Sequence, residues 1–203
     1  MERQHLMHVE EVIPLNKQRC KVSLEGGFVF PLYNSERKRF GIEQGNVLTQ
    51  EAFLEITQKI LPERAKARAC YLLQAKDYTE AEMQRKLREG CYPEETIQQV
   101  IGILKEYHYI DDISYADHYI QSKREKQSAK KIYCTLLQKG ISADILRPLF
   151  EKNPCEEERQ IRKWLEKKHF DPEKLEGKER QKAMMALARK GFSWEIIQSI
   201  LRQ

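Results

Sequence analysis

A helical pattern that recurs three times is the feature that most constrains how this chain can fold. Each copy has two apolar residues four positions apart and a glycine three positions after the second. The glycines lie fifty and fifty-one residues apart, and another apolar helix is predicted after each. Glycine closes a helix readily because it adopts the left-handed conformation at little cost. The copies are Met83…Leu87…Gly90, Tyr133…Leu137…Gly140 and Met184…Ala188…Gly191.

An additional helix precedes each copy, at residues 63–76, 112–126 and 155–169. The pattern therefore predicts three tandem three-helix repeats, each too small to bury its apolar stripe without its neighbours. Pro148 falls inside the last helix of the middle repeat and should kink or shorten it. The predicted repeats are 62–110, 111–152 and 153–203.

Residues 1–61 are different and read as a small strand-rich segment. Apolar and polar residues alternate from Cys20 to Leu24, which is typical of a half-buried strand. Gly26-Gly27 supplies a tight turn, and Pro31 limits the next strand to an edge or an end. Thr49 caps a helix that completes the segment. A β-hairpin or meander of this size is marginal alone, so we expect it to lean on the helices.

The composition excludes several classes of protein. No apolar run approaches the ~20 residues of a membrane span, and no apolar core follows the first basic residue, so we expect a soluble, cytoplasmic protein. The five cysteines are scattered and include no CxxC pair. Reduced, packed thiols are therefore expected rather than a disulfide or zinc framework.

The sequence does not predict an enzyme. Its histidines are dispersed, and the only pair at a metal-binding spacing, His5 and His8, lies near the terminus without a neighbouring cysteine or acid. Asp111 or Asp112 is better explained as a helix cap. The chain has no glycine-rich phosphate loop, nucleophile elbow or HExxH pattern. We therefore predict no catalytic residue, metal or cofactor.

Basic residues are the better indication of function. The net charge is +5, and residues 118–152 hold eight basic and three acidic residues. Such an excess suggests a polyanion or an acidic protein surface as partner. Basic residues also occur on the second helix of every predicted repeat, which would place a line of positive charge along the array. The candidate binding residues are Arg85, Lys86, Lys123, Arg124, Lys130 and Lys131.

Several segments together resemble the RecX family, regulators of the RecA recombinase. The segments are 78–87, 110–119, 122–124 and 131–141, in the family's order and spacing. The resemblance is strong over about 76–141 and looser in the third repeat and the strand segment. Between Lys126 and Lys131 the family usually has a glycine and often an arginine pair, whereas this chain has Ser128 and two lysines, which lack the planar two-pronged donor of arginine.

The resemblance implies an elongated, curved, monomeric array that lies in the groove of a RecA filament on single-stranded DNA. There it would suppress ATP hydrolysis, strand exchange and co-protease activity, and so modulate recombination and the SOS response. Some family members also bind DNA themselves.

Two alternatives remain open from the sequence. Tandem three-helix units also suit a nucleic-acid-binding module that acts directly on DNA, with a steep salt dependence and no need for a recombinase. The second alternative is a protein that acts as a scaffold for another acidic protein. The strand segment is expected to dock on the first repeat or to offer an edge strand to a partner.

Overall fold

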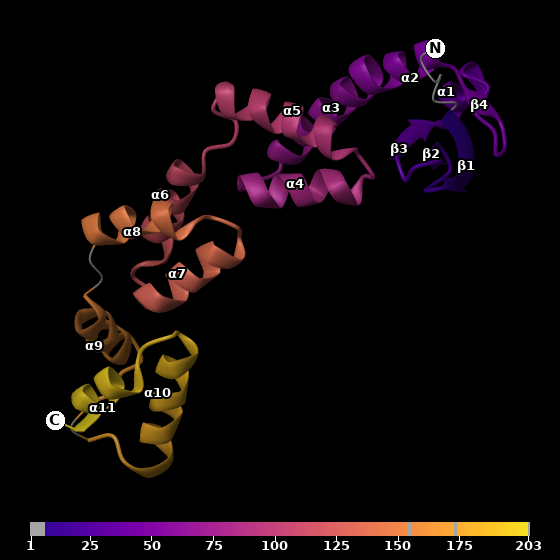
Figure 1. The fold of residues 1–203 in the computed structure, drawn as a ribbon. Coiled ribbons are helices and arrows are strands. Elements are labelled where there is room, and N and C mark those ends of the chain that lie inside the picture. The colour runs from indigo at the N-terminus through magenta and orange to yellow at the C-terminus, as the bar shows by residue number, and fades with distance from the viewer. Residues whose placement is uncertain (1–6, 154–155, 173, 203) are drawn as a thin grey trace. The chain divides into compact units, whose positions relative to one another are not determined.

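The computed structural model describes residues 7–153, 156–172 and 174–202. The described part of the chain is mainly helical and begins with a small antiparallel sheet (Figure 1). It divides into two compact units, Met1–Ile110 and Asp111–Gln203. Unit 1 holds the sheet and the first three-helix repeat, and unit 2 holds the other two repeats.

The sheet of unit 1 has four strands in the order β3-β2-β1-β4. They are β1 (Met7–Pro14), β2 (Arg19–Leu24), β3 (Val29–Tyr33) and β4 (Val47–Leu48), all antiparallel. Gly26 and Gly27 lie in the predicted turn between β2 and β3, and both have positive φ. Pro31 lies on the edge strand β3, where its missing N–H removes no bond to a further strand. The sequence pattern did not predict β4, which has only two residues.

One continuous helical run links the sheet to the first repeat. Short α1 (Asn34–Arg39) precedes it, and the run consists of α2 (Gln50–Glu55), the π-helical turn η1 (Ile56–Ile60) and α3 (Leu61–Leu73). Thr49 caps its start by accepting the Ala52 N–H at 3.2 Å. Pro62 lies in the first turn of α3. The helix expected over 63–76 nevertheless does not begin after a loop, because α3 continues directly from α2 and η1. The Leu61 N–H donates to the Ile56 carbonyl, five residues back, and this wide turn carries the helix past the proline.

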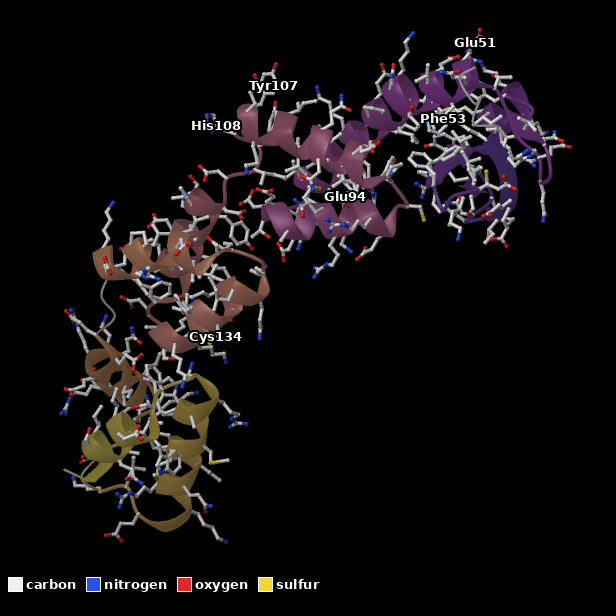
Figure 2. The ribbon with its side chains drawn as sticks, in the orientation of Figure 1. Glu51, Phe53, Glu94, Tyr107, His108 and Cys134 are labelled. Carbon is white, nitrogen blue, oxygen red and sulfur yellow. The ribbon has the colours of Figure 1, made fainter. Side chains whose placement is uncertain are left out.

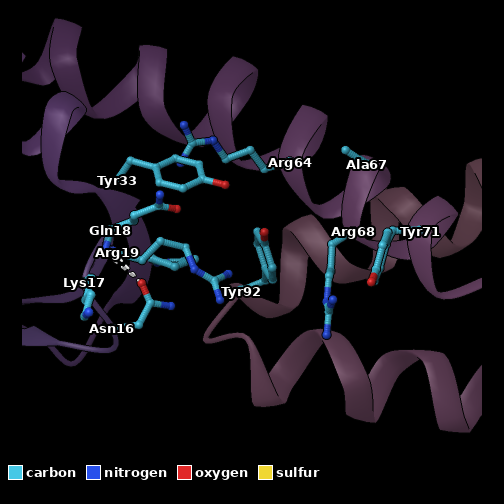
Figure 3. Close-up of a pocket in the computed structure, with 11 residues that line it drawn as sticks. Asn16, Lys17, Gln18, Arg19, Tyr33, Arg64, Ala67, Arg68, Tyr71 and Tyr92 are labelled. Carbon is cyan, nitrogen blue, oxygen red and sulfur yellow. Dashed lines mark hydrogen bonds between the residues drawn. The ribbon is translucent and has the colours of Figure 1, made fainter.

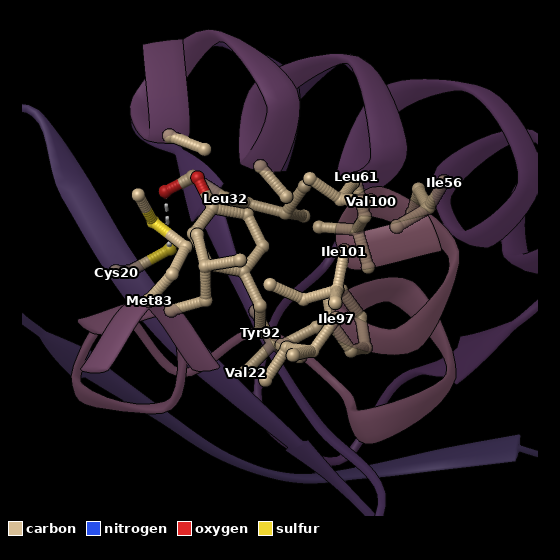
Figure 4. Close-up of a cluster of buried hydrophobic side chains, with 14 of the residues drawn as sticks. Cys20, Val22, Leu32, Ile56, Leu61, Met83, Tyr92, Ile97, Val100 and Ile101 are labelled. Atoms are coloured by element: carbon tan, nitrogen blue, oxygen red, sulfur yellow. Dashed lines mark hydrogen bonds between the residues drawn. The ribbon is translucent and has the colours of Figure 1, made fainter. Parts of the chain in front are cut away.

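The first repeat continues with α4 (Glu80–Glu89) and α5 (Glu94–Glu106). Thr79 and Glu82 form the predicted capping box at the start of α4. Residues of the sheet, such as Val22 and Leu32, share one buried cluster with Leu61, Met83 and other residues of the repeat (Figure 4). The sheet therefore docks on the first repeat, which was one of the two roles expected for this segment.

The second repeat, in unit 2, comprises α6 (Asp112–Lys123), α7 (Ala129–Gln138) and α8 (Ala143–Lys152). Asp111 caps α6 by accepting the Ile113 and Ser114 N–H groups, as the sequence suggested. Helix α8 passes through Pro148 and continues to Lys152. The core of the second repeat consists of Ala116, Ile120, Ile132, Leu136, Ile141 and Leu146.

The third repeat comprises α9 (Glu157–Lys167), α10 (Gly177–Arg189) and α11 (Trp194–Arg202). Its acidic start, Glu156 to Glu158, lies at the N-terminus of α9, where the helix dipole favours negative charge. Its core contains Ile161, Leu165, Ala183, Leu187 and Ile197, all nearly or fully buried.

The helix stops correct the predicted alignment of the repeats. Gly140 and Gly191 have φ of 90° and 91°, but in the first repeat the left-handed residue is Cys91, with φ of 63°. Gly90, which the sequence analysis took as the equivalent stop, has φ of −84°. The true offset between the first two repeats is therefore 49 residues, and the buried apolar residues Met83 and Leu87 of α4 align with Ile132 and Leu136.

Candidate functional site

The two predicted cations on α4 are partly neutralised by one carboxylate. Lys86 Nζ lies 2.7 Å from Glu89 Oε2, and Arg85 Nε lies 4.0 Å from Glu89 Oε1. The Lys86 bond is the main reason that the pKa of Glu89 is lowered. Both pairs are solvent-exposed, so they stabilise α4 only weakly and leave both cations accessible to a partner.

Arg88, also on α4, is committed to the repeat itself. Its Nε and Nη2 atoms donate to the two carboxylate oxygens of Glu94 at 2.9 and 2.8 Å, across the turn to α5. With a further bond from Gln98, this fork lowers the pKa of Glu94 to about 2. Glu94, labelled in Figure 2, therefore stays ionised well into acid.

The basic end of α6 is more open. Lys123 Nζ lies 5.8 Å from the centre of the Tyr119 ring, and Arg124 is the exposed C-cap. Arg124 also lines a cleft of about 410 Å³ whose other cations include Lys152, Arg159 and Lys163. Arg159 and Lys163 are paired with acids of the same cleft, at 3.1 and 3.5 Å. Arg124 and Lys152 have no ion pair among the residues that the structure describes.

The two lysines at the start of α7 differ in accessibility. Lys130 is exposed. The pKa of Glu195 is lowered mainly by hydrogen bonds from its own backbone N–H and the Ser193 hydroxyl, and the positive charge of Lys130 lowers it further. Lys131 instead turns toward the third repeat, and its Nζ donates to the Arg189 carbonyl at 2.6 Å. A cation suits that position because the C-terminus of α10 is the negative end of its dipole. Lys131 thus has a structural contact in addition to its predicted role.

Lys131 belongs to a joint between the second and third repeats, centred on buried Ser128. The Ser128 N–H donates to the Lys190 carbonyl at 3.1 Å, and its hydroxyl accepts the Lys131 N–H at 3.2 Å. The next N–H, of Ala129, donates to Glu157 Oε1 at 3.1 Å. The first turn of α7 is therefore capped by residues of both repeats.

The corrected alignment changes which basic residues occupy equivalent positions in the three repeats. Once Cys91, Gly140 and Gly191 are superposed, Arg85 aligns with Cys134, and Lys86 aligns with Thr135. Basic residues do occur on the second helix of every repeat, but Arg85 and Lys86 therefore have no basic residue at the equivalent position of the second repeat. Of the four candidates on α4 and α7, Lys131 alone has a basic counterpart, Lys182, in the third repeat.

Comparisons with known proteins decide the family. Residues 65–104 match the family model described as RecX, first three-helix domain, and 156–201 match that of the third. The chain is 31% identical over 197 residues to the "Regulatory protein RecX" of Clostridium perfringens strain 13, which covers 95% of this chain and 93% of that protein. The chain belongs to the RecX family. A relative of the same name in Caldanaerobacter subterraneus is 31% identical over 199 residues, 96% of this chain and 98% of that protein.

Solved RecX structures share the fold of this RecX-family chain. One, titled "Crystal structure of regulatory protein RecX", has a TM-score of 0.56 at 23% identity and covers 98% of this chain and 100% of its own. RecX from Lactobacillus salivarius has a TM-score of 0.54 at 23% identity, over 70% of this chain and 95% of its own. At these identities the likeness supports the architecture alone.

The described residues contain no group of three or more side chains suited to hold a metal ion. His5 and Cys155 lie outside the described residues, whereas Cys20, Cys70, Cys91 and Cys134 are free thiols. None of the described helices is long and apolar enough to cross a membrane. The curated relatives are named as regulatory proteins.

The joint formed by Ser128, Glu157 and Lys190 was not predicted from the sequence. A signal was present, because Ser128 stands three residues before Lys131 at the start of a predicted helix, which is the usual N-cap spacing. Its partners were not predictable in this way, since they lie about thirty and sixty residues further along the chain.

Proposed function

We propose that this chain regulates a RecA recombinase. It binds in the groove of the RecA filament on single-stranded DNA as a monomer and suppresses ATP hydrolysis, strand exchange and co-protease activity. The observation that carries the proposal is membership of the RecX family over nearly the whole chain. The three-helix repeats with exposed cations support it physically, because a filament of protein and DNA presents negative charge along its groove.

Five of the six predicted cations, two in unit 1 and three in unit 2, are assigned to filament binding. Arg85, Lys86, Lys123, Arg124 and Lys130 remain exposed or half-exposed and bind the filament through salt-sensitive contacts. Lys131 is set aside because its ammonium group already caps α10. The protein acts without a cofactor and is expected in the cytoplasm, where its partner works.

The test is a titration of the cognate RecA with this chain, at fixed salt, with single-strand-dependent ATP hydrolysis as the readout. Inhibition is expected at well below one chain per RecA subunit. The triple variant Lys123→Glu, Arg124→Glu, Lys130→Glu should require at least tenfold more protein for the same inhibition.

The matched control reverses Lys59, Lys66 and Lys38, exposed cations of unit 1 that are not assigned to filament binding. It should inhibit like the parent chain. Equal loss in both triple variants would show a general charge effect and count against the assigned residues. No inhibition by the parent chain at any ratio would contradict the proposed function.

A further inference from the structure

A cleft rich in cations and tyrosines lies within unit 1, between the sheet and α3 (Figure 3). Its volume is about 690 Å³, and its walls come from the β1–β2 turn, β3, α3 and the turn between α4 and α5. None of its lining residues is acidic, although the chain as a whole has 31 acidic residues. The cleft is therefore a local concentration of positive charge. Its cations are Lys17, Arg19, Arg64 and Arg68.

Three of these cations are available to a ligand. Arg64 is occupied, since its guanidinium pairs with Glu36 and stacks 4.0 Å above the centre of the Tyr33 ring. Lys17, Arg19 and Arg68 have no ion pair among the residues that the structure describes. The charge of Arg68 interacts electrostatically with Glu89, but that carboxylate is paired with Lys86 at 2.7 Å.

Two of the three tyrosines that line the cleft are exposed. Tyr71 is 65% exposed and Tyr33 is 38% exposed, while Tyr92 is almost buried. The Arg64 guanidinium lies 4.0 Å from the centre of the Tyr33 ring, and the Arg68 guanidinium lies over the Tyr71 ring at 5.6 Å. Because Tyr71 is 65% exposed, its ring still offers surface to a flat partner, beside a guanidinium that has no ion pair among the described residues.

The cleft is held in place before any ligand binds. Asn16 Oδ1 accepts the N–H groups of Gln18 and Arg19 at 2.9 and 3.0 Å, which fixes the turn. Asn34 Nδ2 donates to the Lys17 carbonyl at 3.2 Å and ties that turn to α1. On α3, residues 64, 68 and 71 are spaced by four and three and so share one helix face, and the small side chain of residue 67 leaves space between them.

We propose that this cleft binds a short stretch of single-stranded nucleic acid, with phosphates on Lys17, Arg19 and Arg68 and one base stacked on Tyr71. Grooves that combine positive charge with exposed aromatic rings bind unpaired strands in this way. An acidic peptide would satisfy the cations but has no general counterpart for the open ring. In a duplex the bases are already stacked on each other, so Tyr71 favours the single strand. The binding needs no recombinase and is separable from the proposed function.

The test is fluorescence anisotropy of a labelled oligothymidine with the full-length chain, without RecA, over a series of salt concentrations. The double variant Arg19→Ala, Arg68→Ala should weaken binding at least tenfold. It should also make the log–log salt slope shallower by about 0.7 for each lost phosphate contact. Tyr71→Ala should weaken binding about fivefold or more, the effect of one lost base–ring stack, with little change in the salt slope.

Two matched controls remove the same groups elsewhere in unit 1. Lys59→Ala, Lys66→Ala removes two exposed cations, and Tyr107→Ala removes a tyrosine that is 64% exposed at the end of α5. Neither should change oligothymidine binding by more than twofold. Far-ultraviolet circular dichroism on all variants checks that each is folded.

Three results would overturn the proposal. They are no oligothymidine binding by the parent chain at low salt, equal losses in the cleft and control variants, or displacement of the label by polyglutamate as readily as by unlabelled oligothymidine. Inhibition of RecA ATPase is measured separately on the same variants, so a failure of the cleft and a failure of the proposed function are distinguished.

Discussion

Gly191 packs directly against Ser128 where the third repeat meets the second. A Cβ built on Gly191 would lie 2.6 Å from the Ser128 hydroxyl oxygen and 2.6 Å from the Lys131 Cβ. Both distances are far below normal contact, and the Ser128 hydroxyl is fixed because it caps α7. The joint thus requires glycine for two reasons, the absence of a side chain and a φ of 91°.

Gly191→Ala should therefore destabilise the chain strongly. The left-handed conformation alone costs a residue with a Cβ about 1–2 kcal/mol, and the close contacts force Ser128 or Lys131 to move. We expect a loss of at least about 2 kcal/mol in the free energy of unfolding, measured by urea denaturation followed by circular dichroism.

Gly177→Ala is the matched control, because Gly177 also has positive φ, of 52°, but nothing lies within 4 Å of its added Cβ. It should show the conformational cost alone and be the milder variant. If the two glycine variants were equally stable, the close packing at Ser128 would be contradicted.

Cys91 takes the position that glycine holds in the other two repeats. Its φ of 63° strains any residue that has a Cβ, and glycine would relieve this strain. Cys91→Gly should stabilise the chain by up to about 1 kcal/mol, because greater freedom of the unfolded chain offsets part of the gain. Thermal and urea unfolding measure the change.

Cys91→Ala is the control for the loss of the thiol, since alanine keeps the Cβ and the strain. It should bring no gain in stability. A stabilisation of the same size in both variants would trace the effect to the cysteine side chain rather than to the backbone.

These two positions show what the sequence could and could not predict. The three-helix repeats were predictable because apolar stripes and caps such as Thr79 and Asp111 determine a helix locally. The register was not, because glycine marks the stop in two repeats, whereas in the first repeat a glycine stands one residue before the true left-handed position. A neighbouring glycine is a stronger sequence signal than a cysteine, so the alignment slipped by one.

The site was harder to predict for a related reason. Charge identifies Lys130 and Lys131 equally, but only the packing of the third repeat shows that Lys131 reaches a carbonyl 58 residues away. The same holds for the cleft of unit 1, where Arg19 and Tyr71 come together only because the sheet docks on α3. Contacts between distant segments depend on the tertiary fold, which local patterns do not encode.

Acid should break the link between α4 and α5. The pKa of Glu94 falls from 4.5 to about 2 because Arg88 and Gln98 bind its charged form. The contribution of this carboxylate to stability is therefore complete above pH 4.5 and is lost as the pH falls toward 2. Carboxyl chemical shifts measured by NMR should give Glu94 an apparent pKa near 2.

Arg88→Gln should return the pKa of Glu94 most of the way toward 4.5, since the Arg88 hydrogen bonds are the largest cause of the shift. Lys105→Gln, on the other end of α5, is the control and should leave this titration unchanged. An ordinary pKa for Glu94 in the parent chain would contradict the forked contact with Arg88.

The adjacent lysines of α7 should separate stability from partner binding. Lys131→Met removes a hydrogen bond to the Arg189 carbonyl at the negative end of α10, so it should lower the free energy of unfolding by about 0.5–1.5 kcal/mol. Lys130→Met removes an exposed charge and should leave stability within about 0.5 kcal/mol of the parent.

If Lys130 faces the RecA filament, Lys130→Met should weaken ATPase inhibition and its salt dependence, whereas Lys131→Met should inhibit normally at a temperature where it is fully folded. The opposite pairing, with unchanged stability and lost inhibition in Lys131→Met, would place Lys131 on the binding surface and contradict its role in the joint.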